Sequence, residues 1–69
     1  MTPTNKELAD GIGVSESYAS RLRSGKRRPS ITTLVALAEY LKVSHDELVV
    51  AYSHGREHFG AYLREALGE

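Results

Sequence analysis

The sequence predicts an all-α fold, a compact bundle of five helices. Residues that start helices recur along the chain, and the apolar residues after them repeat at intervals of three and four positions. The strict alternation of apolar and polar residues that is typical of half-buried strands is missing. With 69 residues and no cysteine, the chain forms one small core without disulfides or thiolate-metal sites. We therefore expect a second copy to add stability.

The composition favours a soluble protein of a reducing cytoplasm. Residues 1–11 are polar and charged where a signal peptide would carry an apolar stretch. The longest apolar run is far below the about 20 residues that a membrane span requires. We therefore expect no membrane partner, and no motif implies a cofactor.

The first helix is expected to begin after Thr4. Thr4 and Glu7 have the spacing of a capping box, in which the hydroxyl accepts from an amide three residues on and the carboxylate reaches back. An apolar stripe follows, which consists of Leu8, Ala9 and Ile12. Gly11 and Gly13 are expected to end the helix, and Gly13 permits the left-handed backbone that a sharp turn requires.

A second helix is expected over residues 15–24. Ser15 can cap its start, and Gly25 stops it. Its inward apolar positions are Ala19 and Leu22, with Tyr18 beside them. Only one short turn therefore separates it from the first helix.

Two more helices follow. Pro29 cannot lie inside a helix, and Ser30 can cap a third helix over roughly 31–42. Apolar residues cover more than half of its circumference, so it is expected to be the central element. Ser44 and Glu47 have the spacing of a second capping box and start the fourth helix.

A C-terminal helix is expected after a break at Gly55. One face of it carries Phe59, Tyr62, Leu63, Ala66 and Leu67. We divide the chain into residues 1–53, the domain of the first four helices, and residues 54–69, the C-terminal helix.

The basic residues are concentrated in one short segment. The formal net charge is zero, yet five of the nine cations and no acid lie within residues 21–28. Residues 1–30 carry six cations and three acids, whereas residues 31–69 carry three cations and six acids. A local positive patch attracts a polyanion whatever the total charge of the protein.

Two helices joined by the turn Gly13-Val14-Ser15 predict a helix-turn-helix, whose second helix enters the major groove of DNA. Over residues 4–50 the chain resembles the phage repressor and Cro-type, or Xre-like, helix-turn-helix family. The matching features are Leu8-Ala9, Gly13-Val14-Ser15, Leu22, the segment Ser24 to Pro29, and Val43-Ser44 before Asp46-Glu47-Leu48. The resemblance implies a lambda-repressor-like fold. The family's usual first helix is absent or lies outside this sequence, because only three residues precede Thr4.

The outward face of the second helix is expected to read bases. Positions i, i+3, i+4 and i+7 lie opposite the two inward apolar residues. The predicted base-reading residues are Glu16, Ser17, Ser20, Arg21 and Ser24. Arg21 suits a bidentate contact to guanine, and short serines let the helix approach the base edges. The resemblance points to the same positions, since family members read bases from this face.

A second set of residues is expected to contact phosphates. The predicted phosphate-binding residues are Thr4, Asn5, Ser15, Lys26, Arg27 and Arg28. The three cations leave the end of the second helix, and each phosphate they neutralise releases condensed counterions. Thr4 and Asn5 resemble the family's phosphate-contacting amino end, where free amides favour an anion.

Three residues near this face have other interpretations. Glu16 either accepts from cytosine N4 or only favours the positive start of its own helix. Tyr18 is interpreted as a packing residue rather than a DNA contact. Arg23 stands where the family often has an acidic residue, and the sequence assigns it no role.

His54 and His58 belong to a stretch, HGREH, that fits the H-x-x-E-H pattern of inverted zinc peptidases. Gly55 disfavours a helix there, and only eleven residues follow. We therefore interpret both as surface or interface histidines and predict neither an enzyme nor a metal site.

The C-terminal helix is expected to cover the apolar surface that the missing first helix leaves. The residues assigned to this task are Phe59, Tyr62, Leu63 and Leu67, either within the chain or across a two-fold dimer. The predicted function is a Cro-like or repressor-type transcriptional regulator, a homodimer on a pseudo-palindromic duplex operator in a bacterial or phage-infected cell, at the nucleoid. The alternatives are an antitoxin whose C-terminal helix grips a toxin, a protein-interaction module without DNA binding, and a metallopeptidase.

Overall fold

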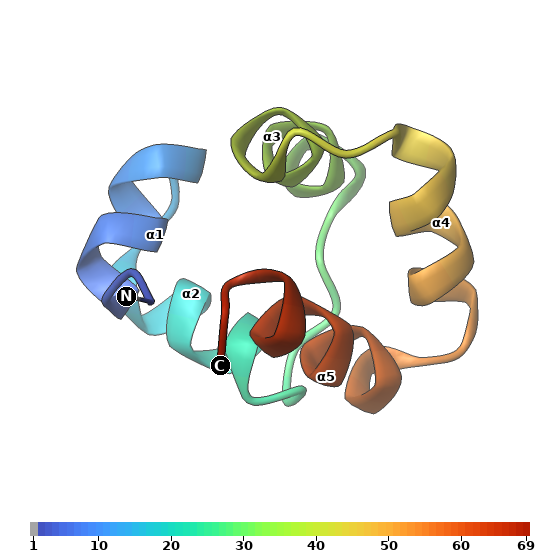
Figure 1. Cartoon of the computed structure of the whole chain (residues 1–69). Coiled ribbons are helices and arrows are strands. Elements are labelled where there is room, and N and C mark those ends of the chain that lie inside the picture. The colour runs from blue at the N-terminus through green and yellow to red at the C-terminus, as the bar shows by residue number, and fades with distance from the viewer. Residues whose placement is uncertain (1) are drawn as a thin grey trace.

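The computed structural model describes residues 2–69, and over this range the chain forms five helices and no strand (Figure 1). The helices are α1 (Asn5–Ile12), α2 (Glu16–Arg23), α3 (Ile31–Leu41), α4 (His45–Ser53) and α5 (Arg56–Ala66). The prediction of an all-α, five-helix fold is therefore confirmed. Met1, with which the predicted 1–53 domain begins, lies outside the described residues.

Side-chain hydroxyls start four of the five helices. The hydroxyls of Thr4, Ser15, Ser30 and Ser44 each accept a hydrogen bond from the amide three residues on. At Thr4 the capping box is complete, because its own amide donates to the Glu7 carboxylate over 2.8 Å. These caps satisfy amides that have no partner within a helix, and they fix where each helix begins.

The second predicted capping box is only half formed, which corrects the sequence prediction. The Ser44 hydroxyl accepts from the Glu47 amide, but the Glu47 carboxylate turns to α5 and accepts a 2.5 Å hydrogen bond from the Tyr62 hydroxyl. Burial, followed by this hydrogen bond and the negative charge of Glu47, raises the pKa of Tyr62 to about 12. A long-range contact between α4 and α5 thus replaces the local one.

The turn between α1 and α2 depends on a left-handed glycine, as predicted. Gly13 has φ of 74°, and the Val14 amide donates to the Ala9 carbonyl over 3.0 Å. Gly11, by contrast, does not end the helix, and that expectation was wrong. It lies inside α1, and the Tyr40 ring packs where a side chain at this position would be.

The core draws on every helix. Its largest fully buried side chains are Leu8, Leu22, Leu37, Leu48, Phe59 and Leu63. In Figure 1, α1, α3 and α4 surround the core on three sides, and α5 lies beside α2 on the fourth. Leu67 is also buried, and Tyr62 is half buried against the same core. The apolar side of α5 therefore packs within its own chain.

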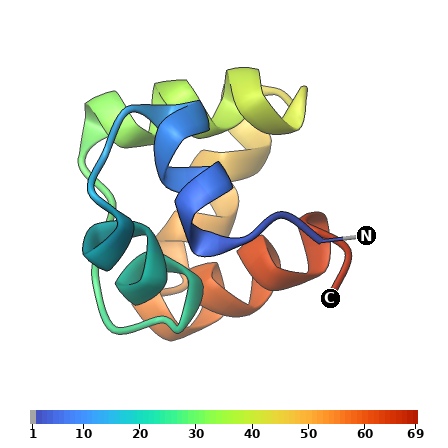
Figure 2. The ribbon, with the colours of Figure 1, turned by 90° about the vertical axis from the view of Figure 1, so that its left-hand side faces the viewer.

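The two ends of the chain meet. Figure 2 shows them side by side, and an ideal Cβ on Gly68 would lie 3.7 Å from the Thr2 methyl carbon. The end of α5 therefore lies next to the start of α1. None of the helices within residues 2–69 is long and apolar enough to cross a membrane.

Two glycines allow α5 to approach the end of α2 closely. A Cβ on Gly60 would lie 2.6 Å from both the Cα and the amide nitrogen of Gly25. Such distances leave no room for a methyl group, so the end of α2 rests directly on the backbone of α5. Gly25 itself has φ of 78°, which other residues adopt at a cost.

Replacing Gly60→Ala is expected to lower the free energy of unfolding by about 1–3 kcal/mol, because the methyl group must displace a backbone. Alanine normally stabilises a helix interior by about 1 kcal/mol relative to glycine, so the clash reverses the usual sign. Chemical denaturation measures the change. The matched variant Ala61→Gly, one position along on the exposed side, calibrates the helix propensity. A more stable Gly60→Ala protein would contradict the close contact.

Candidate nucleic-acid interface

The side of α2 that faces away from the core carries short polar side chains. Ala19 and Leu22 are fully buried, whereas the residues predicted to read bases are exposed. Those exposed residues are Glu16, Ser17, Ser20, Arg21 and Ser24. The Ser24 hydroxyl already donates to the Arg21 carbonyl over 3.2 Å, so it closes the end of the helix. The remaining side chains form a narrow polar ridge on the exposed side of α2. The ridge consists of Glu16, Ser17, Ser20 and Arg21.

The three cations after α2 are exposed, and two of them lie over aromatic rings. The Arg27 guanidinium carbon is 5.4 Å from the centre of the Tyr18 ring, and that of Arg28 is 5.6 Å from the Tyr52 ring. At these distances the aromatic rings attract the guanidinium groups and restrain the two arginine side chains. Lys26 is exposed with its amide bonded to the Arg21 carbonyl.

Tyr18 ties this basic loop to α2. Its hydroxyl donates to the Arg28 carbonyl over 3.3 Å and accepts from the Ser30 amide over 3.2 Å. Its ring also packs against the core. The sequence interprets the tyrosine as a packing residue, and spacing alone could not reveal that its hydroxyl also holds the end of the loop, at Arg28 and Ser30.

The other predicted phosphate ligands already have local partners. The hydroxyls of Thr4 and Ser15 accept from amides at the starts of α1 and α2. A hydroxyl that accepts keeps its own hydrogen to donate, so capping leaves both able to contact an anion. Asn5 is half buried, and its side-chain oxygen accepts from Arg23 over 3.2 Å.

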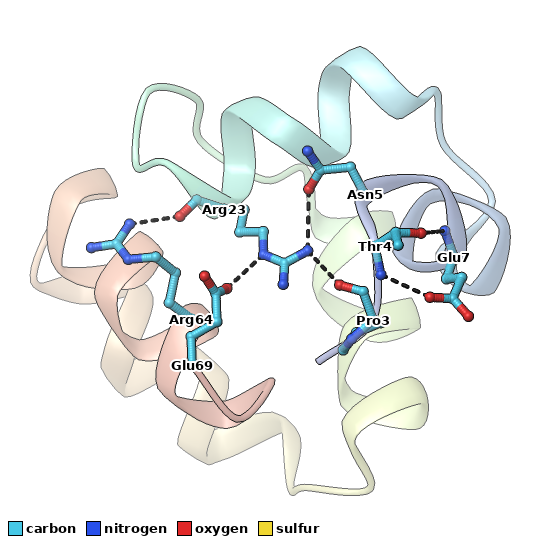
Figure 3. Close-up of polar contacts among 7 residues, drawn as sticks. All are labelled: Pro3, Thr4, Asn5, Glu7, Arg23, Arg64 and Glu69. Carbon is cyan, nitrogen blue, oxygen red and sulfur yellow. Dashed lines mark hydrogen bonds and ion pairs between the residues drawn. The ribbon is translucent and has the colours of Figure 1, made fainter. Parts of the chain in front are cut away.

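Arg23 is the residue whose importance the sequence did not reveal. It is the last residue of α2, and its guanidinium points to the meeting chain ends (Figure 3). Its Nε lies 2.6 Å from the Glu69 carboxylate, and Nη1 donates to the Pro3 carbonyl over 2.8 Å. The Arg64 guanidinium in turn donates to the Arg23 carbonyl over 2.6 Å. The one signal in the sequence was an arginine where the related family often has an acid.

An open polar hollow of about 450 Å³ lies between the start of α1 and the end of α2. Among the residues that line it are Thr4, Asn5, Ser20, Arg23 and Ser24. The fold therefore brings predicted phosphate ligands from α1 next to predicted base-reading residues of α2. They are distant in sequence and share one surface.

The two histidines of the HGREH stretch lie on different helices. His54 caps the end of α4, Gly55 separates the helices with φ of 98°, and His58 belongs to α5. The ring centres are 4.8 Å apart. Across residues 2–69, no group of three or more His, Cys, Asp or Glu side chains is placed to hold a metal ion.

Comparison with known proteins identifies the segment that carries this surface. The model of a family described as helix-turn-helix matches residues 4–48. The uncharacterized HTH-type transcriptional regulator y4dJ of Sinorhizobium fredii (strain NBRC 101917 / NGR234) is 46% identical over 46 residues. This match covers 67% of the present chain and 60% of the length of that relative. No solved structure matches the chain.

The matched segment contains α1, α2 and the basic loop, and the tight turn between the two helices has the geometry that the motif requires. The chain belongs to the Xre-like helix-turn-helix family, whose shared domain binds DNA and is not catalytic.

Proposed function

We propose that the protein is a sequence-specific transcriptional regulator of the Cro-like or repressor type that binds double-stranded DNA through α2. The observation that carries this proposal is that α2 has two different sides, one with Ala19 and Leu22 buried and one with the polar ridge exposed. Three cations, at residues 26–28, follow shortly after its end. A rigid helix with small polar side chains fits the major groove. Such a regulator works in the cytoplasm, where the DNA of a bacterium or an infecting phage lies.

The ridge of α2 supplies the base contacts. Arg21 is exposed at the C-terminal end of the ridge, and its guanidinium can donate two hydrogen bonds to guanine O6 and N7. Ser17 and Ser20 precede it on the same side of α2 and can contact bases or nearby phosphates. Glu16, in the first turn, accepts from cytosine N4. These contacts determine which DNA sequence is preferred, whereas phosphate contacts determine the register and orientation of the protein on the duplex.

The phosphate contacts come from residues around the ridge. Lys26, Arg27 and Arg28 follow the end of the ridge, and two of them lie over aromatic rings. Ser15 caps the start of α2, and Thr4 and Asn5 line the hollow next to Ser20. Six of the nine acids lie in residues 31–69, after the two helices of the helix-turn-helix. This distribution attracts the phosphate backbone to the ridge in spite of a net charge of zero.

Selection of bound duplexes from a random pool tests the proposal as a whole. We expect one enriched motif with two inverted half-sites whose centres lie about 34 Å apart, one turn of the double helix. The motif gives both the sequence preference and the symmetry of the complex. Failure to retain any duplex in dilute buffer would refute DNA binding.

Two substitutions separate base contacts from phosphate contacts. Arg21→Ala is expected to relax the preference at one base pair, a loss of about 1–3 kcal/mol of discrimination. Arg27→Ala is expected to weaken all duplexes alike and to flatten the plot of log affinity against log salt by about 0.9. Titrations of the selected duplex and of single-base variants at several salt concentrations measure both. Identical behaviour of the two variants would contradict the assignment.

We also propose that two copies of the chain bind together through α3 and α4. The side chains of Ile31, Val35 and Val49 are 80%, 41% and 55% exposed, and they border a groove of about 320 Å³ with Leu34 and Leu48. Among the described residues that line this groove, only His45 can carry a charge. An apolar surface of a few hundred Å² on a monomer is often an interface.

A second copy is the occupant that this face fits best. A two-fold interface packs the same patch of both copies against each other, and this patch offers both the exposed Ile31 side chain and the groove beside it. A net charge of zero creates no long-range repulsion between two copies. The apolar side of α5, the other region considered for a dimer, packs in the core of its own chain.

Replacing Val49→Glu is expected to convert the dimer to a monomer, because two carboxylates would be buried in one small apolar interface. Analytical ultracentrifugation measures the mass. Val50→Glu is the matched control, since Val50 is 60% exposed on the same helix but does not line the groove. Dimerisation that survives Val49→Glu would contradict the proposed face.

A further inference from the structure

Arg23 occupies an unusual position for a cation at the end of a DNA-binding helix. Its side chain is only 14% exposed and points to Pro3 and Glu69, near the two ends of the chain (Figure 3). The Glu69 carboxylate neutralises it over 2.6 Å, and the Pro3 carbonyl accepts a second hydrogen bond. A charge that is already paired and mostly covered has little to gain from a phosphate. The side chain therefore acts on its neighbours.

One of these neighbours is Asn5, a proposed phosphate ligand. A guanidinium can only donate, so the Asn5 amide must turn its oxygen to Arg23, at 3.2 Å from Nη1. The amide nitrogen then points away from Arg23, as Figure 3 shows. This NH₂ group has no hydrogen-bond partner among residues 2–69, and Asn5 lines the same hollow as Ser20 and Ser24 of α2.

The other contacts hold Arg23 itself in place. Arg64 of α5 donates to the Arg23 carbonyl over 2.6 Å, and Glu69 follows α5 directly. The end of α5, the end of α2 and the start of α1 are thereby joined at one side chain. Without it, the Asn5 amide could rotate and offer its oxygen, which repels a phosphate.

We infer that Arg23 is a positioning residue for DNA binding: it fixes the side chain of Asn5 so that the amide NH₂ donates to a backbone phosphate. This inference rests on the proposed function. It adds a residue that sets the affinity for every sequence without touching DNA. The Asn5 amide carries no charge, so its contact with a phosphate adds affinity but releases no counterions.

A double-substitution cycle tests the inference on the full chain. Arg23→Met and Asn5→Ala are each expected to weaken binding of the selected duplex about threefold to tenfold, the effect of one hydrogen bond. In the Asn5→Ala background, Arg23→Met is expected to cause no further loss, because the group it positions is gone. The salt dependence of binding should stay unchanged in all three variants. A direct phosphate contact by Arg23 would instead lower the salt slope by about 0.9 and add to the loss from Asn5→Ala, and either result would overturn the inference.

Two further variants separate positioning from folding. Asn5→Asp keeps an oxygen acceptor for Arg23 but removes the donor, so the melting temperature should hold while DNA affinity falls at least as far as in Asn5→Ala. Arg23→Lys keeps the charge but lacks the planar guanidinium that reaches both Asn5 and Glu69, so it should behave as Arg23→Met does.

Lys42→Gln is the control for the loss of a positive charge. Lys42 lies just past the end of α3, so its replacement should leave DNA binding unchanged. Full affinity in Asn5→Asp would overturn the inference.

The outcomes keep the inference distinct from the function on which it rests. If no variant and no wild-type protein binds duplex DNA, the proposed function fails. If the wild type binds and the Asn5 and Arg23 losses add up, DNA binding stands and only the positioning role is refuted.

Discussion

The close contact between α2 and α5 is the constraint on which the rest of the structure depends. The helix that carries the polar ridge has eight residues, and isolated helices of that length are marginal in water. Only two of its side chains, Ala19 and Leu22, are buried. Besides its packing on α1, it is supported just past its end, where Gly25 rests on Gly60 with no space for a side chain between the two backbones. The C-terminal helix thus supports α2 from behind.

This support has consequences for binding. A helix that is already rigid loses little conformational freedom when it enters a groove, so more of the contact energy appears as affinity. The loop after α2 is held in the same way, through the Tyr18 hydroxyl and two aromatic rings under Arg27 and Arg28. The groups that we propose to contact bases and phosphates are therefore arranged before DNA arrives.

Local chemistry made much of the fold predictable from the sequence. The hydroxyl caps, the left-handed turn at Gly13 and the burial of Ala19 and Leu22 depend on residues a few positions apart. The expectations that were wrong depend on distant residues. Gly11 lies within α1 under the Tyr40 ring of α3, and the Glu47 carboxylate bonds to Tyr62 of α5 instead of completing its capping box. Spacing along one helix contains no information about either partner.

The same limit applies to the candidate site. The exposed positions of α2 follow from helical periodicity, so the sequence could place them on one side. Arg23 could not be interpreted, because its partners come from both ends of the chain, Pro3 and Asn5 at one and Glu69 at the other. The apolar residues of the C-terminal helix left two possibilities open, and the structure has Phe59 and Leu63 buried within the chain.

The most direct test of the account is a titration of the ¹⁵N-labelled protein with a selected duplex, followed by amide chemical shifts. The largest shifts are expected at Ser17, Ser20 and Arg21, at residues 26–28 and at the start of α1, while the amides of α3 and of the second half of α5 change little. Strong shifts centred on α3 and α4, with the ridge of α2 unaffected, would contradict the claim that α2 is the helix that meets DNA.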